Sequence, residues 1–221
     1  MISFTVFYKP LSMHIDVQCK ESRNVNLDFK PIVLRKFDRR DDCLVVSVSE
    51  LLRTSKRVTS TLDLTSETAE DSILSEFNLK RPSNSICLNI ANIKLCGRPD
   101  FQIETGKEII YGEIKTSKKY SIWSFNWLKH KGKPVIVDDK IQDIFLTGII
   151  QSSLYSLLDD LSNNRGKETL HSSFIFGSKV ESKAYYFSLK AGLANKTVLN
   201  SFVESRVRKI VTSRSVSFPT I

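Results

Sequence analysis

An aspartate, a glutamate and a lysine near the middle of the sequence have the types and the spacing that metal-dependent hydrolysis requires. Apolar and polar residues alternate on both sides of Thr105–Gly106, with Asp100 before this stretch and Glu113 and Lys115 after it. The alternation predicts a β-hairpin, because glycine readily adopts the backbone conformation of a tight turn. With Thr105 and Gly106 as the loop, Asp100 faces Tyr111 and is the diagonal neighbour of Glu113. Diagonal neighbours lie roughly 7–8 Å apart at the backbone, close enough for two carboxylates to share a metal ion.

The alternation of side chains along a strand adds a third group to these two acids. Glu113 and Lys115 should point to one face of the sheet, while Ile114 points into the layer behind it. The two carboxylates and the Ile114 carbonyl are hard oxygen ligands, which suit Mg²⁺ or Mn²⁺. A compact ammonium beside them can orient an attacking water or stabilise charge that develops on a phosphate. The hairpin therefore predicts a phosphodiester-cleaving centre in which Asp100, Glu113 and Ile114 bind metal and Lys115 is catalytic.

The same residues resemble the PD-(D/E)XK nuclease superfamily, whose pattern is met by Pro99-Asp100 and by Glu113-Ile114-Lys115 with a hairpin between them. A Glu-x-Lys tripeptide alone usually marks a solvated strand face, so the surrounding residues matter. Gly97-Arg98 stands just upstream, and Gln151-x-x-x-Tyr155 downstream resembles the signature of RecB-like nucleases. In that family the glutamine and tyrosine lie beside the metal centre and help to hold substrate.

The resemblance covers residues 43 to 190 and implies both a fold and an activity. The fold is α/β with a restriction-endonuclease-like core, in which helices flank a mixed central β-sheet. The activity is that of a metal-dependent DNA nuclease that prefers single strands or DNA ends. A non-cleaving nucleic-acid-binding module of the same fold and an RNA endonuclease of the cap-snatching type are the alternatives. The RecB-like residues favour DNA as the substrate.

A third acid is expected from a helix over residues 66–78, because the superfamily takes one from its first core helix. Glu70 heads the apolar stripe of this helix, which continues with Ile73, Leu74 and Phe77. By resemblance Glu70 completes the metal shell through water. The helix dipole also favours an acid near the N-terminus, so Glu67 and Asp71 remain alternatives.

The cysteines argue against a metal cluster. Residues 43–57 resemble the first segment of Cas4-like nucleases, but Thr54 or Ser55 stands where that family has a cysteine, and no cysteine follows Cys96. An iron–sulfur cluster needs four suitable ligands, so none is expected. The spacing of the four cysteines also lacks a C-x-x-C zinc pattern. In an intracellular chain they are expected to be free thiols.

Basic and aromatic residues alternate after the hairpin. Residues 116–137 contain no acid, and the lysines and rings expected to contact nucleic acid are Lys118, Lys119, Tyr120, Trp127, Lys129, Lys131 and Lys133. Lysines can follow a phosphate backbone, and exposed rings can stack on bases. Trp123 and Trp127 are also spaced like two core residues on one helix face. Both interpretations remain open.

Composition and charge favour a polyanionic partner. The 221-residue chain has a formal net charge of +9, which attracts nucleic acid, although a merely basic surface would have the same charge. No apolar run is long enough to span a membrane and no signal peptide is evident, so no membrane partner is expected. The chain is expected to act in the cytoplasm, that of the host if the chain is viral.

The remaining patterns predict the order of elements around the site. Short strands are expected over residues 1–35, a short strand with a serine-capped helical turn over 43–57, and a strand run over 85–96 in which Asn89 and Asn92 are candidates for a turn or bulge. Closing strands are expected at 174–176 and 185–189, and the last helix over about 196–211. The longest helix runs through Ile144 to Leu161, and Asp138 or Asp139 should cap it. Residues 1–42 should form a β-rich N-terminal addition to a nuclease domain of residues 43–221.

Overall fold

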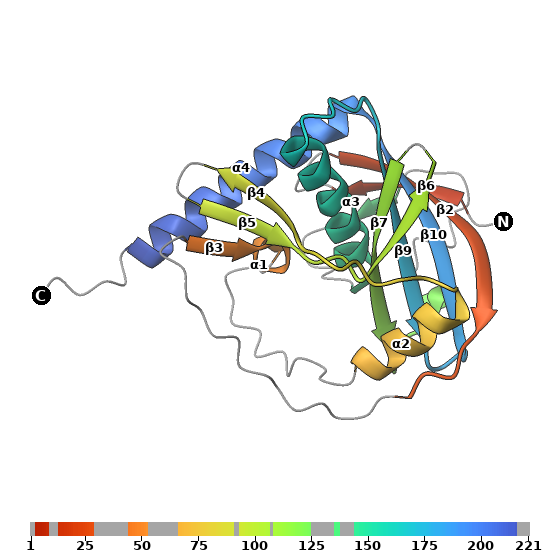
Figure 1. The fold of residues 1–221 in the computed structure, drawn as a ribbon. Helices are drawn as coiled ribbons and strands as arrows, with labels where there is room; N and C mark the ends of the chain where they lie inside the picture. Colours follow the sequence, from red (N-terminus) through yellow and green to blue (C-terminus); the bar gives the residue numbers. More distant parts are fainter. Residues whose placement is uncertain are drawn as a thin grey trace, which may run out of the picture.

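The computed structural model describes residues 3–8, 13–28, 44–52, 66–90, 93–106, 108–124, 135–137 and 144–215. These residues form a mixed α/β structure with a seven-stranded mixed sheet, helices on both of its faces, and a separate three-stranded sheet (Figure 1). The expectation of a mixed sheet flanked by helices is confirmed. No helix in this part of the chain is both long and apolar enough to cross a membrane.

The large sheet has the strand order β6-β7-β9-β10-β2-β1-β8. In that order the strands are Phe101–Thr105, Glu108–Ser117, Leu170–Ser178, Lys183–Ala191, Met13–Asn24, Ser3–Tyr8 and Val135–Val137. β7 and β9 are parallel, as are β1 and β8, and the other neighbours are antiparallel. Parallel neighbours need a crossover connection, and helix α3, Ile144–Ser162, lies between β7 and β9 in the chain.

The small sheet holds β3, Leu44–Ser47, β5, Ile93–Gly97, and β4, Ile86–Ile90. Helix α1, Val48–Leu52, follows β3, and the Glu50 N–H donates to the Ser47 hydroxyl at 3.2 Å. The predicted strand with a serine-capped helical turn is therefore confirmed. The strand run expected over 85–96 forms the antiparallel pair β4 and β5.

Two cysteines of the small sheet are joined. The register of β4 and β5 sets Cys87 directly opposite Cys96, and the structure has a disulfide between them. The expectation of free thiols is wrong for this pair, because only the strand register reveals that the two residues face each other. Cys19 is a free thiol.

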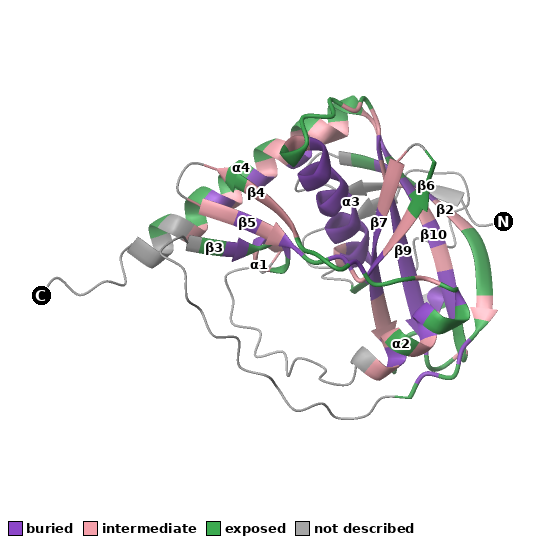
Figure 2. Ribbon diagram, viewed as in Figure 1, coloured by how far each residue is buried: buried purple, intermediate pink, exposed green. Residues whose placement is uncertain are grey.

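Helix α3 lies between the two sheets and is buried along most of its length (Figures 1 and 2). It packs on β7 and β9 on one side and on β4 on the other. Its Phe145 ring contacts Phe174 of β9 edge to face, with 4.8 Å between the ring centroids. A Cβ atom at Gly148 would lie 2.1 Å from the Phe174 ring, so glycine permits this close helix–sheet contact. Phe145, Phe174 and Gly148 therefore set the distance between α3 and the sheet.

The opposite face of the large sheet is covered by helix α2, Ser66–Glu76, which confirms the predicted helix over 66–78. Ile73 of α2 belongs to a core cluster with Phe101, Ile114 and Ile175 of the sheet. Ile114 thus lies in the α2 layer, whereas the aromatic residues under α3 belong to another cluster. The residues on either side of Ile114 consequently face α3.

The ends of the chain also contribute to this assembly. β1 and β2 extend the large sheet beyond β10, and the predicted boundary between residues 42 and 43 lies outside the described residues. Helix α4, Leu193–Ser215, begins before the predicted residue 196 and contacts α1, α3, β2 and β10. The predicted capping residues Asp138 and Asp139 lie outside the described part of the chain.

Candidate active site

The hairpin is present, but its register differs from the predicted one. Thr105 pairs with Glu108, so Thr105 belongs to the strand pair rather than to the loop. Thr105 Oγ1 accepts a hydrogen bond from the Glu108 N–H at 3.2 Å and donates one to the Glu108 carbonyl at 3.0 Å, which closes the turn. A shift of two residues preserves the face of every side chain.

The changed register brings the two acids closer than predicted. Phe101 pairs with Gly112, and the Asp100 N–H donates to the Gly112 carbonyl at 3.0 Å, so Asp100 stands opposite Glu113 rather than diagonal to it. Asp100 Oδ2 accepts a hydrogen bond from the Ile114 N–H at 2.7 Å. Lys115 Nζ donates to Glu113 Oε1. The structure therefore brings Asp100, Glu113 and Lys115 together at the end of the hairpin, while the side chain of Ile114 packs in the α2 layer.

Gln151 and Tyr155 of α3 complete this cluster. The buried Tyr155 hydroxyl donates to Glu113 Oε2 at 2.9 Å, and Gln151 Nε2 donates to the Tyr155 hydroxyl at 2.7 Å. Gly97, at the end of β5, lies against the other side of the tyrosine, where a Cβ atom would be 2.7 Å from the ring. Only glycine leaves room for Tyr155 in this position. The Tyr155 hydroxyl therefore holds one carboxylate oxygen of Glu113, and Lys115 holds the other.

Glu70 reaches the cluster from α2. Its side chain is 15 % exposed, and its charge acts on both Glu113 and Lys115. Asp71, one of the two alternatives, is 67 % exposed and pairs with Arg81, and the side chain of Glu67 lies outside the described residues. Of the acids in this helix whose side chains are described, Glu70 is the one placed to act with Asp100 and Glu113.

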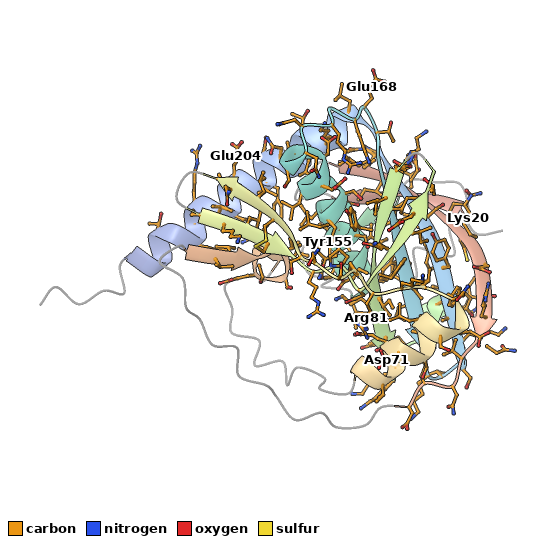
Figure 3. The ribbon with its side chains drawn as sticks, viewed as in Figure 1. Lys20, Asp71, Arg81, Tyr155, Glu168 and Glu204 are labelled. Atoms are coloured by element: carbon orange, nitrogen blue, oxygen red, sulfur yellow. A yellow bond between two sulfur atoms is a disulfide. The ribbon has the colours of Figure 1, made fainter. Side chains whose placement is uncertain are left out.

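Arg81 is a site residue that the sequence did not reveal. Its Nη2 atom lies 2.8 Å from Asp71 Oδ1 and 3.6 Å from Glu70 Oε2, and Figure 3 shows it between the labelled Asp71 and Tyr155. An arginine in the connection between a helix and a strand is common on protein surfaces. Its position beside the acids depends on how α2 packs against the sheet, which no local sequence pattern indicates.

The acids of the cluster are crowded enough to change their protonation. Burial and the charge of Glu113 raise the pKa of Asp100 to about 7. Burial likewise raises the pKa of Glu113 despite the opposing effects of Lys115 and Tyr155. Burial lowers the pKa of Lys115, but Glu113 and Asp100 outweigh it and the net direction is upward. Lys115 is therefore an ammonium, and the buried acids lack enough positive charge nearby.

The donor set fits a hard divalent cation. Glu70, Asp71, Asp100 and Glu113 carry four negative charges when ionised, and Lys115 and Arg81 supply two positive ones, so a single divalent ion would balance these six side chains. Carboxylate oxygens are the ligands that Mg²⁺ and Mn²⁺ prefer. Within the described residues, no three His, Cys, Asp or Glu side chains already have the geometry of a metal site.

The expected nucleic-acid residues are only partly described. Lys118, Lys119 and Tyr120 follow β7 and are exposed, and the N–H groups of Lys119 and Tyr120 donate to the Ser117 hydroxyl. Trp127, Lys129, Lys131 and Lys133 lie outside the described residues. Trp123 lies in a short 3₁₀ turn, Ile122–Ser124, and is 48 % exposed, so it is not the core residue that one interpretation expected.

A second buried polar cluster lies at the C-terminal end of α3. Asp160 Oδ2 is 2.5 Å from Lys196 Nζ, and Asp160 Oδ1 accepts from the Lys167 N–H at 2.7 Å. Asp159 Oδ2 lies 3.3 Å from Arg165 Nε, and Tyr111 Oη donates to its other oxygen at 3.3 Å. Acids at a helix C-terminus oppose the helix dipole and so require such partners. This cluster ties the turn after α3 to α4 and fixes α3 against β7.

A scan against models of known protein families finds no match for this chain, and a search of curated proteins finds none either. The functional assignment therefore depends on the residues and their geometry.

Proposed function

We propose that the chain is a metal-dependent nuclease of the PD-(D/E)XK type, RecB- or Cas4-like but without an iron–sulfur cluster, which hydrolyses phosphodiester bonds in single-stranded DNA or at DNA ends. The observation that carries the proposal is the set of hydrogen bonds that joins Lys115, Glu113, Tyr155 and Gln151, with Asp100 bonded to the Ile114 N–H between Glu113 and Lys115. These residues come from the hairpin and from a distant helix, and all five are those that the resemblance implies. The order of β6, β7, α3 and β9 supports a restriction-endonuclease-like core.

The carboxylates of Asp100 and Glu113, the Ile114 carbonyl and Glu70 would hold Mg²⁺ or Mn²⁺. When bound, such an ion supplies Lewis acidity to the phosphate and makes a bound water more acidic. The acids gain from this because they lie buried with too little positive charge around them. The hydrogen bond between Asp100 Oδ2 and the Ile114 N–H fixes one carboxylate for this task.

Lys115 would act directly on the reacting groups. The charges of Glu113 and Asp100 raise the pKa of Lys115 by more than burial lowers it. Lys115 therefore remains an ammonium and donates hydrogen bonds rather than accepting a proton. It would orient the attacking water and stabilise the charge on the phosphate as the new P–O bond forms and the old one breaks. Tyr155 keeps Glu113 in place, and Gln151 orients the Tyr155 hydroxyl.

Nucleic acid is supported as the substrate by the charge of the chain and by the residues after β7. The net charge is +9, and the exposed Lys118, Lys119 and Tyr120 begin directly after the strand that carries Lys115. A phosphate backbone bound along them would lead toward the acids. The proposal places this activity in the cytoplasm, the compartment that the sequence predicts.

The test is incubation of the purified protein with end-labelled single-stranded, circular single-stranded and duplex DNA and with RNA. Each substrate is incubated with the protein in the presence of Mg²⁺, Mn²⁺ or a chelator. Cleavage of DNA that requires the metal and disappears in Lys115→Ala, but not in Lys183→Ala, supports the proposal. Lys183 is an exposed lysine at the start of β10 and serves as the matched control. Binding without cleavage would instead favour the non-cleaving module, and cleavage of RNA alone would favour the RNA endonuclease.

A further inference from the structure

Arg81 is anchored beside the hairpin by its backbone. The preceding residue, Lys80, forms a bridge with Gln102 of β6, in which the Gln102 N–H donates to the Lys80 carbonyl at 3.1 Å. Gln102 is close in the chain to Asp100. The position of Arg81 is therefore fixed relative to the acids both by this bridge and by its contacts with α2.

The guanidinium borders the acid cluster where the cluster meets solvent. The side chain of Arg81 is 37 % exposed, whereas those of Glu70 and Glu113 are 15 % and 4 % exposed. Arg81 Nη2 lies 2.8 Å from Oδ1 of the well-exposed Asp71 and 3.6 Å from Glu70 Oε2. The charge of Arg81 also acts on Asp100. A substrate that reaches the buried acids from solvent on this side would meet Arg81.

We propose that Arg81 is a phosphate-binding residue of this site and that Asp71 holds its side chain in position when no substrate is bound. The proposal rests on the nuclease function proposed above. A guanidinium has five N–H donors in a planar fork, enough to bind two phosphate oxygens. Asp71 and the phosphate then compete for one cation. Cation binding by Glu70 and Asp100 would strengthen the preference of Arg81 for the phosphate, because it neutralises acids that attract Arg81.

This competition makes a specific prediction about two neighbouring residues. Arg81→Gln should weaken binding of single-stranded DNA in Mg²⁺ by about tenfold or more, as expected for loss of a charged hydrogen bond. Asp71→Asn should tighten binding, because it releases Arg81. The effect of Asp71→Asn should vanish in the double variant with Arg81→Gln, since Asp71 acts through Arg81. Binding is measured in a Lys115→Ala background so that the DNA stays intact, and cleavage in the otherwise unchanged protein.

Control variants separate this effect from general electrostatics. Arg23 and Glu21 form an exposed ion pair at 3.1 Å, and Arg23 also donates to the Glu76 carbonyl at the end of α2. Arg23→Gln and Glu21→Gln remove the same kinds of charge, and Arg23→Gln also removes a contact with α2. Because neither residue belongs to the acid cluster, the effects of these variants on DNA binding should be small. Thermal unfolding of each variant checks that the fold is retained. Arg81→Lys, which keeps the charge but loses the fork, should bind DNA with an affinity between those of the parent and Arg81→Gln.

The outcomes distinguish this inference from the proposed function. If the unchanged protein cleaves DNA and Arg81→Gln cleaves and binds it equally well, Arg81 is a structural residue and the nuclease proposal stands. An equal effect of Asp71→Asn with and without Arg81 would likewise overturn the competition between them. If the unchanged protein neither cleaves nor binds any nucleic acid, both the function and the role of Arg81 are wrong.

Discussion

The Tyr155 hydroxyl donates a hydrogen bond of 2.9 Å to Glu113 across a separation of 42 residues in the chain. This bond joins the middle of α3 to the strand that carries Lys115. Its geometry depends on Gly97, which leaves space for the tyrosine ring, and on Gln151, which donates to the same hydroxyl. The hydroxyl keeps its proton, because burial and the charges of Glu113 and Asp100 raise the pKa of Tyr155. Tyr155 is thus a permanent donor to Glu113.

Replacing Tyr155 by phenylalanine should slow cleavage while leaving the fold intact. The ring still packs against Gly97, but Glu113 Oε2 loses its donor and the carboxylate is less well fixed. A buried acceptor without its partner costs about 1–3 kcal/mol, so the unfolding free energy should fall by that amount and the cleavage rate by about tenfold or more. Denaturant unfolding and cleavage under saturating metal check both effects.

Tyr185→Phe is the matched control, because the Tyr185 hydroxyl donates to Glu181 at 3.0 Å away from the site. This variant should lose stability without losing cleavage beyond the small effect of stability itself. Equal cleavage by Tyr155→Phe and Tyr185→Phe would mean that Tyr155 has no role in the site.

Alanine at Asp100, Glu113 or Lys115 should abolish most of the cleavage. Loss of one charge-stabilising group costs at least about a hundredfold in rate. The acid variants should also bind Mn²⁺ more weakly in calorimetric titration, whereas Lys115→Ala should still bind it. Groups that act as a unit are not additive, so the double variant of Asp100 and Glu113 should be scarcely worse than either single one. If the acid variants cleave DNA as fast as the unchanged protein, the centre is assigned wrongly. A chelator control excludes cleavage by a contaminating nuclease.

Local patterns predicted most of the elements, because each has its own signal. The alternation around the hairpin corresponds to β6 and β7. The serine before α1 caps that helix, and the apolar stripe of α2 packs on the sheet. The faces of Glu113 and Ile114 were predictable because side chains alternate along any strand. An error of two residues in the register left those faces unchanged.

The relations that were missed are set by strand register and by packing, which residue types alone do not fix. Thr105 favours a turn, but its hydroxyl bonds to Glu108 and keeps it paired in the ladder, which moved the loop. The position of Arg81 depends on the bridge between Lys80 and Gln102. The facing of Cys87 and Cys96 depends on the register in which β4 and β5 pair.

The Cys87–Cys96 disulfide predicts the number of thiols in the oxidised protein. Reduction should add two to the number of cysteines that react with a thiol reagent in denaturant. Closing so short a loop stabilises a protein by about 2–3 kcal/mol in the chain-entropy model, so reduction should lower the unfolding free energy by up to that amount. Cys87→Ser with Cys96→Ser should make stability insensitive to reductant.

Four reactive thiols before reduction, in protein exposed to air, would contradict the disulfide. Alkylation of the protein inside cells measures its free thiols before isolation. A reducing cytoplasm should keep all four cysteines as thiols until the protein is isolated. A disulfide already present in the cell would count against the cytoplasmic location.

The raised pKa of Asp100 predicts opposite effects of pH on stability and on metal binding. Burial and Glu113 raise this pKa from 3.8 to about 7, so between these values the folded protein holds a proton that the unfolded chain has lost. By linkage, the unfolding free energy of the metal-free protein should fall as pH rises from about 4 to about 7. Metal affinity should rise over the same range, because the cation displaces this proton, and should level off above it. Thermal unfolding in chelator and Mn²⁺ titration at several pH values measure the two effects.

Asp100→Asn should reduce both pH dependences, whereas Glu104→Gln, which changes an exposed acid of β6, should leave them as in the unchanged protein. Identical pH profiles for Asp100→Asn and the unchanged protein would show that another group governs the titration.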